Sequence, residues 1–310
     1  MKKNEFKKAE QTEKENAQQM AHRYNNDYLE PPIMQEHASA FVKYVSQNVK
    51  PGDRVLDLGC ASATLWGHFK KLLPDDITLV GVDLSPEMLN QARIQFPKCD
   101  FREGSFLDIP SKDAEFDVVI VSSAFHHIND LLLPDSLKEI SRVMDEHGIL
   151  IGREPLVTGR LGDRGGWFSG LLMNLRHLVY RLTHTREYPE PDPGIDHHAY
   201  NVLDFLDIIN SKSTFQVENI EFRNPISLFL ARVHNKDVAE IAKYLDYSIE
   251  HREGQEIHYI AHKNFVGPTQ LLDSVRLTLQ ENKISDEELK NLSTRIAAAA
   301  LVIEKILKKP

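Results

Sequence analysis

The chain has 310 residues, of which 41% are hydrophobic and 27% charged, as in an ordinary globular protein. Its 37 Lys and Arg residues against 46 Asp and Glu give a net charge of −9, which argues against a nucleic-acid partner because nonspecific binding needs a cationic surface. Two cysteines, Cys60 and Cys99, exclude a disulfide framework, and the sequence has neither a signal core nor an apolar run of about 18 residues, so we expect a cytoplasmic protein.

From the amino end, residues 1–30 are polar and mixed in charge, and we expect them to be either disordered or a flap that closes over the rest. Residues 33–49 then have apolar side chains at helical spacing. After them, strands and helices alternate: strands are predicted at 54–58, 77–83, 100–102, 117–121 and 149–152, and helices at 64–72, 85–96 and 134–144. Continuous apolar strands separated by helices predict an α/β fold with a mostly parallel sheet covered on both faces.

This pattern divides the chain into a flap at 1–30, a core at 31–155, an insertion at 156–210, closing strands of the core at 211–265 and a helical tail at 266–310. The insertion interrupts the alternation with glycines and prolines, and so long an interruption usually forms a lid or a substrate wall. The tail has a broad apolar helical face. We expect that face either to cover the pocket or to pair two subunits as a homodimer.

The strongest motif is the turn that follows the first predicted strand. It contains Asp57, Gly59, Ala61 and Ala63 in the segment VLDLGCASAT. The turn after the first strand of an open α/β sheet is where nucleotide-like ligands bind, and small residues let the backbone approach a ligand closely. The third glycine of the dinucleotide fingerprint is missing, which disfavours a nicotinamide oxidoreductase.

A second signal is Asp83, which closes the second predicted strand. A carboxylate at this position accepts hydrogen bonds from the ribose hydroxyls of an adenosine. The alternative role is the N-cap of the next helix, but Ser85 followed by Pro86 already provides the cap. We therefore predict that Asp83 contacts a ribose.

These motifs resemble those of the class I S-adenosylmethionine-dependent methyltransferases. The resemblance covers about residues 30–155, through the first motif at 57–63, the acidic Asp83, the segment 104–110 (GSFLDIP) and the segment that runs from Phe116 to two adjacent histidines. The chain departs from the family at Ser105, where an aspartate is common, and at 146–148, where a surface turn usually reads Pro-Gly-Gly.

The resemblance implies a doubly wound, mostly parallel, Rossmann-like sheet of seven strands with a helical cap and C-terminal helices. It also implies S-adenosyl-L-methionine as the cofactor, with Ser105 and Phe106 flanking the adenine. Similar family members have an N-terminal flap over the cofactor, which here would include Tyr24 and Tyr28. We assign cofactor binding to Asp57, Gly59, Cys60, Ala61, Asp83, Leu84, Ser105, Phe106 and Ser122.

Catalytic candidates lie just past the fourth and fifth predicted strands. Methyl transfer depends mainly on alignment, and a base is needed only when the acceptor must lose a proton, which histidine does near neutral pH. His127 is our first candidate and His126 the second; the alternative is that they cap a turn or hydrogen-bond within the core. Glu154 either orients the acceptor's hydroxyl or amine, or forms a solvated ion pair at the rim.

Residues 153–186 hold six arginines and no lysine. The segment is a helix with a solvated face, a lid whose arginines meet an anionic substrate, or a basic amphipathic helix in contact with a membrane surface. Histidines and aspartates between 184 and 198 lack any familiar ligand spacing, so we predict no metal.

Together these observations predict a methyltransferase that transfers a methyl group to a small organic acceptor, anionic or lipid-like. Nucleobase substrates are disfavoured because residues 122–127 lack the Asn/Asp-Pro-Pro-aromatic run of enzymes that methylate base amino groups. The alternative is a non-catalytic protein that binds an adenosine ligand and acts through partners.

Overall fold

The computed structural model describes residues 32–128, 131–157, 200–223 and 256–264, together with isolated positions near both ends of the chain. The strands are β1 (Arg54–Leu58), β2 (Thr78–Asp83), β3 (Asp100–Glu103), β4 (Phe116–Ser122), β5 (Met144–Val157), β6 (Tyr200–Asn201), β7 (Phe215–Arg223) and β8 (Glu256–Lys263). The helices are α2 (Pro32–Ser46), α3 (Trp66–Leu72), α4 (Pro86–Gln95), the 3₁₀ turn η2 (Phe125–His127), α5 (Leu133–Val143) and α7 (Val202–Lys212).

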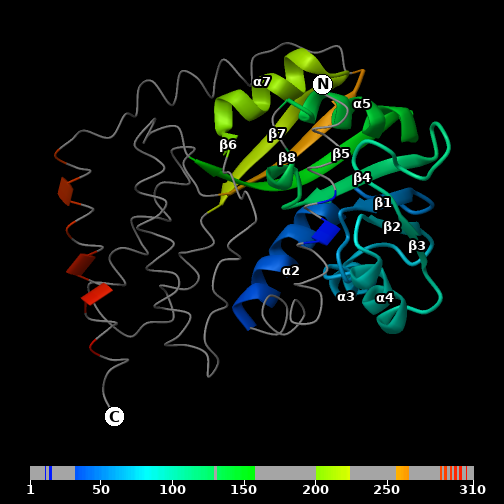
Figure 1. Cartoon of the computed structure of the whole chain (residues 1–310), viewed down its shortest axis with the longest axis horizontal. Coiled ribbons are helices and arrows are strands. Elements are labelled where there is room, and N and C mark those ends of the chain that lie inside the picture. Colours follow the sequence, from blue (N-terminus) through cyan, green and yellow to red (C-terminus); the bar gives the residue numbers. More distant parts are fainter. Residues whose placement is uncertain are drawn as a thin grey trace.

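The strands form one mixed sheet in the order β3-β2-β1-β4-β5-β8-β7, and the short β6 pairs with β5 beside this path (Figure 1). The strands β1 to β5 are parallel to one another, whereas β8 is antiparallel to both β5 and β7. The predicted doubly wound α/β sheet is confirmed. The strand order reverses between β1 and β4, and ligands of such sheets bind at the carboxyl ends of the strands at this point.

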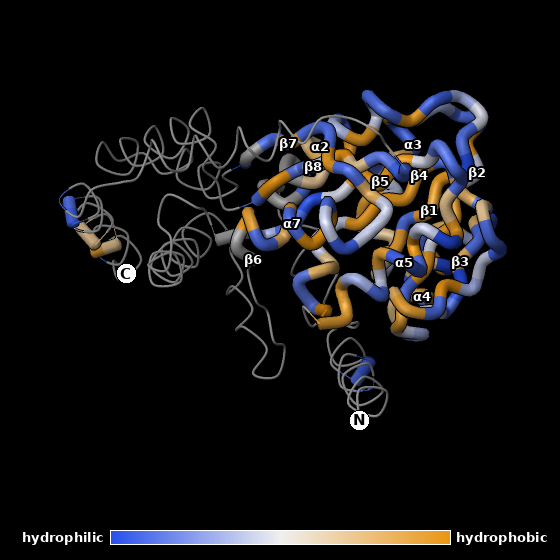
Figure 2. Tube along the Cα trace, turned by 90° about the horizontal axis from the view of Figure 1, so that it is seen from above, coloured by the Kyte–Doolittle hydropathy of each residue, from blue (hydrophilic) through white to orange (hydrophobic). Residues whose placement is uncertain are grey.

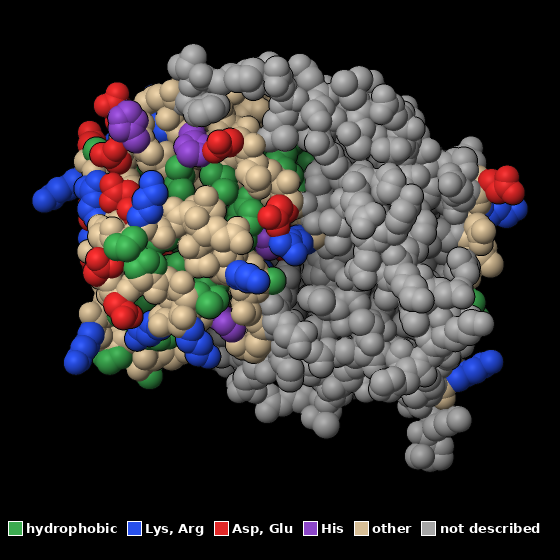
Figure 3. Space-filling model, turned by 180° about the vertical axis from the view of Figure 1, so that it is seen from behind, with side chains coloured by type: hydrophobic (Ala, Val, Ile, Leu, Met, Phe, Trp, Pro, Cys, Tyr) green, Lys and Arg blue, Asp and Glu red, His purple; other side chains and the backbone are tan. Residues whose placement is uncertain are grey.

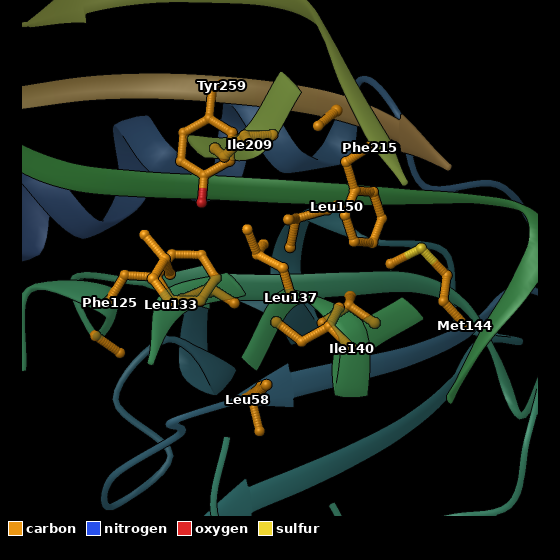
Figure 4. Packing of buried hydrophobic residues seen from close by; sticks show 14 of the residues in the cluster. Leu58, Phe125, Leu133, Leu137, Ile140, Met144, Leu150, Ile209, Phe215 and Tyr259 are labelled. Atoms are coloured by element: carbon orange, nitrogen blue, oxygen red, sulfur yellow. The ribbon is translucent and has the colours of Figure 1, made fainter. Parts of the chain in front are cut away.

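Each face of the sheet packs against its own set of helices (Figure 1). Because strand side chains alternate, Leu56 and Leu58 join the cluster beneath α5 and α7 (Figure 4). The intervening Val55 joins the cluster beneath α2, α3 and α4, where Phe41 and Trp66 are fully buried. Along the trace, apolar residues concentrate in the strands and the inner sides of the helices (Figure 2).

Helix α7 belongs to this core, although the sequence analysis assigned residues up to 210 to the insertion. Four of its side chains, Val202, Phe205, Leu206 and Ile209, are buried against the cluster beneath α5. Their spacing of three, one and three residues is that of one helical face. The end of the predicted insertion is therefore part of the covering layer of the sheet.

Strand β5 begins earlier and ends later than the predicted strand at 149–152. Met144 pairs with Phe116, and the next paired residues are Ile149 and Val118, so residues 145–148 form an irregularity opposite a single residue of β4. The expected turn at 146–148 thus lies within a bulged strand. Gly148 is required there, because a Cβ atom would lie 2.2 Å from Cγ of Met144.

Gly152 lets an aromatic ring lie flat against the middle of the sheet. It pairs in register with Tyr259 of β8, and a Cβ atom at Gly152 would lie 2.3 Å from both Cζ and Oη of that tyrosine. The ring of Tyr259 extends over β5 toward α5, beside Ile209 of α7 (Figure 4). The glycine therefore fixes how β5 and β8 approach each other.

The described surface carries charges of both signs side by side (Figure 3). Arg54 at the start of β1 binds Asp117 of β4 through three hydrogen bonds, from its main-chain amide, Nε and Nη2. None of the helices in the described part of the chain is long and apolar enough to cross a membrane.

Candidate functional site

The turn after β1 is held in an unusual backbone conformation. Gly59, Ala61 and Ala63 have φ values of +76°, +48° and +62°, in the left-handed region that alanine seldom adopts. The amides of Gly59 and Cys60 both donate to the carbonyl oxygen of Val82 in β2, at 2.8 and 3.1 Å. The neighbouring strand thereby fixes the turn that the sequence identified as the ligand-binding element.

Gly59 also lies close to the end of β4. A Cβ atom on it would be 3.0 Å from Cβ of Ala124 and 3.6 Å from the ring of Phe106. The Phe106 ring in turn lies 5.4 Å from that of Phe125, centroid to centroid. The structure therefore brings together the predicted residues Gly59 and Phe106, which are 47 positions apart in sequence.

Asp83 connects the turn to the following helix. Its Oδ2 accepts the Ala61 amide at 2.8 Å and its Oδ1 accepts the Ser85 amide at 2.9 Å. Burial raises the pKa of Asp83, while these amides and that of Leu84 oppose the rise. Ser85 caps α4, as expected, by accepting the Met88 amide. A carboxylate can accept about four hydrogen bonds, so Asp83 keeps acceptor capacity for at least one ligand hydroxyl.

Asp57 lies deeper than the sequence suggested. Its side chain is 2% exposed, and its Oδ2 accepts the indole Nε1–H of Trp66 at 2.8 Å. Burial raises the pKa of Asp57 to about 7, and the bond from Trp66 works against this rise. Trp66, which the sequence analysis did not single out, therefore ties α3 to the end of β1.

Two other predicted cofactor residues, Cys60 and Ser105, support the backbone of the expected site. The Cys60 side chain is buried. Its Sγ lies beside Gly81, where an added Cβ would be only 2.9 Å away. Cys60 therefore contributes to the turn through its backbone. Ser105 exchanges two backbone hydrogen bonds with Asp108, and its Oγ accepts the Leu107 amide at 3.2 Å. Ser105 thus stabilises the loop that presents Phe106.

Beyond β4, a buried carboxylate organises the turn that carries the two histidines. Glu154 is fully buried. Its Oε1 accepts the amides of Ala124 and Phe125 at 3.0 and 2.9 Å, and its Oε2 accepts the His126 amide at 3.3 Å and lies 3.0 Å from His126 Nδ1. Glu154 is therefore not a solvated rim ion pair, and its two carboxylate oxygens bind the turn after β4.

The two histidines differ in their surroundings. The rings of His126 and His127 lie 4.2 Å apart, centroid to centroid. His126 is buried against Glu154, whereas His127 is only half-buried. Ser123, which precedes them with φ of +52°, donates its amide to the carbonyl oxygen of Arg153 at 2.8 Å. This hydrogen bond therefore attaches the turn to the end of β5.

Ser122 has a partner that the sequence analysis did not assign to the site. Its Oγ accepts the Nε–H of Arg153 at 2.7 Å, and the two residues are direct neighbours across β4 and β5. The guanidinium carbon of Arg153 lies 5.1 Å from the ring centroid of Phe41 in α2. Arg153 therefore belongs to the edge of the sheet where the predicted cofactor residues meet.

Several predictions fall on residues that the structure does not describe. These include Tyr24 and Tyr28 of the predicted flap, residues 158–199 and most of the tail after 264. Within the described ranges no group of three or more His, Cys, Asp or Glu side chains is arranged to hold a metal ion.

Comparisons with known proteins agree with this geometry. Residues 55–148 match a protein family described as a methyltransferase domain. An uncharacterized methyltransferase of Synechocystis sp. is 34% identical over 103 residues, which are 33% of this chain and 46% of that protein. A 2-phytyl-1,4-naphtoquinone methyltransferase of Nostoc sp. is 33% identical over 101 residues, which are 31% of this chain and 43% of that protein. The chain spans less than half the length of these two relatives.

A solved structure shows the same fold at low identity. The geranyl diphosphate C-methyltransferase of Streptomyces coelicolor, in complex with Mg²⁺, geranyl-S-thiolodiphosphate and S-adenosyl-L-homocysteine, aligns with a TM-score of 0.51 at 13% identity. The alignment covers 74% of this chain and 76% of that one. The predicted fold is confirmed, and the prediction of a methyltransferase that uses S-adenosyl-L-methionine agrees with these matches.

Proposed function

Since the chain belongs to the class I S-adenosylmethionine-dependent methyltransferase family, we propose that it transfers the methyl group of S-adenosyl-L-methionine to a small organic acceptor. The observation that carries this proposal is the hydrogen bond from the Ala61 amide to Asp83. It joins the left-handed turn after β1 to a carboxylate with spare acceptor capacity, which is the arrangement that an adenosine ligand needs.

The residues at this edge fit the cofactor. Gly59 offers a surface without a side chain, Asp83 would accept the ribose hydroxyls, and Phe106 would lie against the adenine with Ser105 supporting its loop. When bound, the cofactor supplies a methyl group on a positively charged sulfur. The protein's task is then to hold the acceptor in line with that methyl group.

We assign the two histidines different roles. Glu154 holds the amides of the turn and faces Nδ1 of His126, an arrangement in which a carboxylate orients an imidazole. We therefore give His126 and Glu154 a positioning role. His127 is the more exposed of the two rings, and we propose that it contacts the acceptor and takes its proton where one must be lost.

A lipid-like or anionic acceptor is the finer part of the proposal. Two similar proteins are named for a phytyl naphthoquinone and for geranyl diphosphate, and both names describe small molecules with an apolar chain. We also propose a cytoplasmic protein, with which its two free cysteines are consistent, and a homodimer formed through the C-terminal helices.

The predicted N-terminal flap has one described contact that supports it. Nζ of Lys14 lies 2.5 Å from Oε1 of Glu103 at the carboxyl end of β3. The expected adenine residues Ser105 and Phe106 follow this strand after Gly104. An exposed ion pair adds little stability, so it supports the proposal only because Lys14 lies beside the strand that precedes the expected adenine residues.

Turnover tests this proposal. The full-length protein is incubated with S-adenosyl-L-methionine and a panel of small quinols, phenols and isoprenoid diphosphates, and release of S-adenosyl-L-homocysteine is measured. We expect turnover with at least one acceptor and a loss of about 100-fold or more in His127→Ala, the lower end of what general-base catalysis contributes. Cofactor binding without turnover on any acceptor would favour the alternative, a non-catalytic adenosine-binding protein.

A further inference from the structure

Arg153 is a partly buried cation that forms no ion pair with a described carboxylate. Among the described residues, its guanidinium contacts Ser122 through the bond from Nε and lies over the ring of Phe41. Its Nη1 is buried and has no hydrogen-bond partner among the described residues. Burying part of a guanidinium costs free energy unless a partner replaces the hydrogen bonds that it made to water.

The carboxylates near Arg153 bind other groups. Asp57 is near enough for Arg153 to lower its pKa, but Asp57 binds Trp66 and forms no ion pair. Glu154, the next residue along β5, is occupied by the turn after β4. The described residues therefore supply no counter-charge for Arg153.

The strand on the other side of Arg153 also offers no counter-charge. His258 of β8 is its direct neighbour in register and is fully buried beneath Phe41. Nε2 of His258 lies 2.9 Å from Oε1 of Glu256, so this carboxylate too is engaged. Burial lowers the pKa of His258, and the charge of Arg153 adds to that effect.

We propose that Arg153 is the anion-binding residue of the site and holds a carboxylate or phosphate group of a bound ligand through its unpaired Nη1 edge. Ser122 and Phe41 fix the plane of the guanidinium, which suits two-point recognition of such groups. The location follows from the register: Arg153 pairs with Ser122, and the preceding residue of β4, Val121, pairs with Leu58, directly before Gly59. The anion therefore binds at the edge where the cofactor is expected.

Two ligands of the proposed reaction carry such an anion: the cofactor, at the carboxylate of its amino-acid end, and an anionic acceptor. This inference rests on the proposed function, and the experiment separates the two sources. Binding of S-adenosylhomocysteine is compared with that of 5′-methylthioadenosine, which lacks the amino-acid end. Binding of geranyl diphosphate is compared with that of geraniol, both in the presence of S-adenosylhomocysteine. Titration calorimetry of the full chain is run for wild type, Arg153→Gln and Lys138→Gln.

In at least one pair, we expect Arg153→Gln to weaken binding of the member that carries the carboxylate or diphosphate by about 10-fold or more, the loss of a charge-assisted contact. Binding of the other member should stay within about twofold. Loss in the first pair identifies the cofactor as the source, and loss in the second identifies the acceptor. Lys138→Gln removes the same charge from the exposed side of α5 and should change nothing. If Arg153→Gln does not fold, Arg153→Lys replaces it, with a smaller loss of the same selectivity.

Equal effects of Arg153 substitution on both members of each pair would overturn the role of Arg153 while leaving the proposed function intact. Wild-type protein that binds none of the four compounds would overturn both.

Discussion

Glu154 and His126 form a buried pair, with 3.0 Å between Oε2 and Nδ1. The same carboxylate accepts three backbone amides of the turn after β4. One side chain at the end of β5 therefore determines where the two histidines lie relative to the turn after β1. We therefore expect Glu154 to affect both the position of the two histidines and the stability of the fold.

We predict that Glu154→Gln lowers both stability and turnover. A glutamine presents an NH₂ donor to amides that are themselves donors, and it removes a charge from three charge-assisted bonds, so the free energy of unfolding should fall by about 2–3 kcal/mol. Urea unfolding measures this loss. Glu146→Gln, exposed in the bulge of β5, is the matched control and should remain within about 0.5 kcal/mol of wild type. An equally stable Glu154→Gln protein would show that the carboxylate does not organise the turn.

Substitution of glycine by alanine should have opposite effects on stability at Gly152 and at Gly67. In Gly152→Ala the new Cβ meets the ring of Tyr259 at 2.3 Å, which should cost about 1–3 kcal/mol as overpacking. Gly67 lies in α3 with nothing within 4 Å of a Cβ atom, so Gly67→Ala should stabilise by about 0.5–1 kcal/mol. Thermal unfolding compares the two. In a Tyr259→Ala background the cost of Gly152→Ala should nearly vanish, and full additivity would argue against the contact.

The raised pKa of Asp57 predicts that the free energy of unfolding depends on pH. Its pKa rises from 3.8 to about 7 on folding because of burial. The folded protein then keeps a proton that the unfolded chain releases, so this group's contribution to the free energy of unfolding falls as pH rises from about 4 to about 7. Relative to Asp57→Asn, wild type should lose on the order of a few kcal/mol across this window. Urea unfolding at several pH values tests this, and a constant difference between the two proteins would contradict it.

The sequence predicted those parts of the fold that arise from local patterns. Continuous apolar runs indicated β1, β2 and β4. The small residues after Asp57 indicated the ligand turn, in which Ala61 and Ala63 have left-handed φ values. Helix α7 was missed because the glycines and prolines before it suggested one long insertion, although its apolar spacing is regular.

The roles of individual site residues depended on contacts between distant positions. Nothing local in the sequence distinguishes a carboxylate that faces a ligand from one, such as Glu154, that accepts amides about 30 residues away. The indole of Trp66 behind Asp57 and the lone charge of Arg153 likewise become visible only when the strands are in register. The adjacent polar residues at the end of β5 were the available signal for Arg153.

The most direct test of the central claim is calorimetric titration of the full-length protein with S-adenosyl-L-homocysteine, for wild type, Asp83→Ala and the exposed control Asp76→Ala. The account predicts binding by wild type and Asp76→Ala, and a loss of about 10-fold or more in Asp83→Ala, because a ribose bound to the carboxylate loses charge-assisted hydrogen bonds. Equal affinity of Asp83→Ala and wild type, or no binding by wild type, would contradict the assignment of this edge of the sheet as the cofactor site.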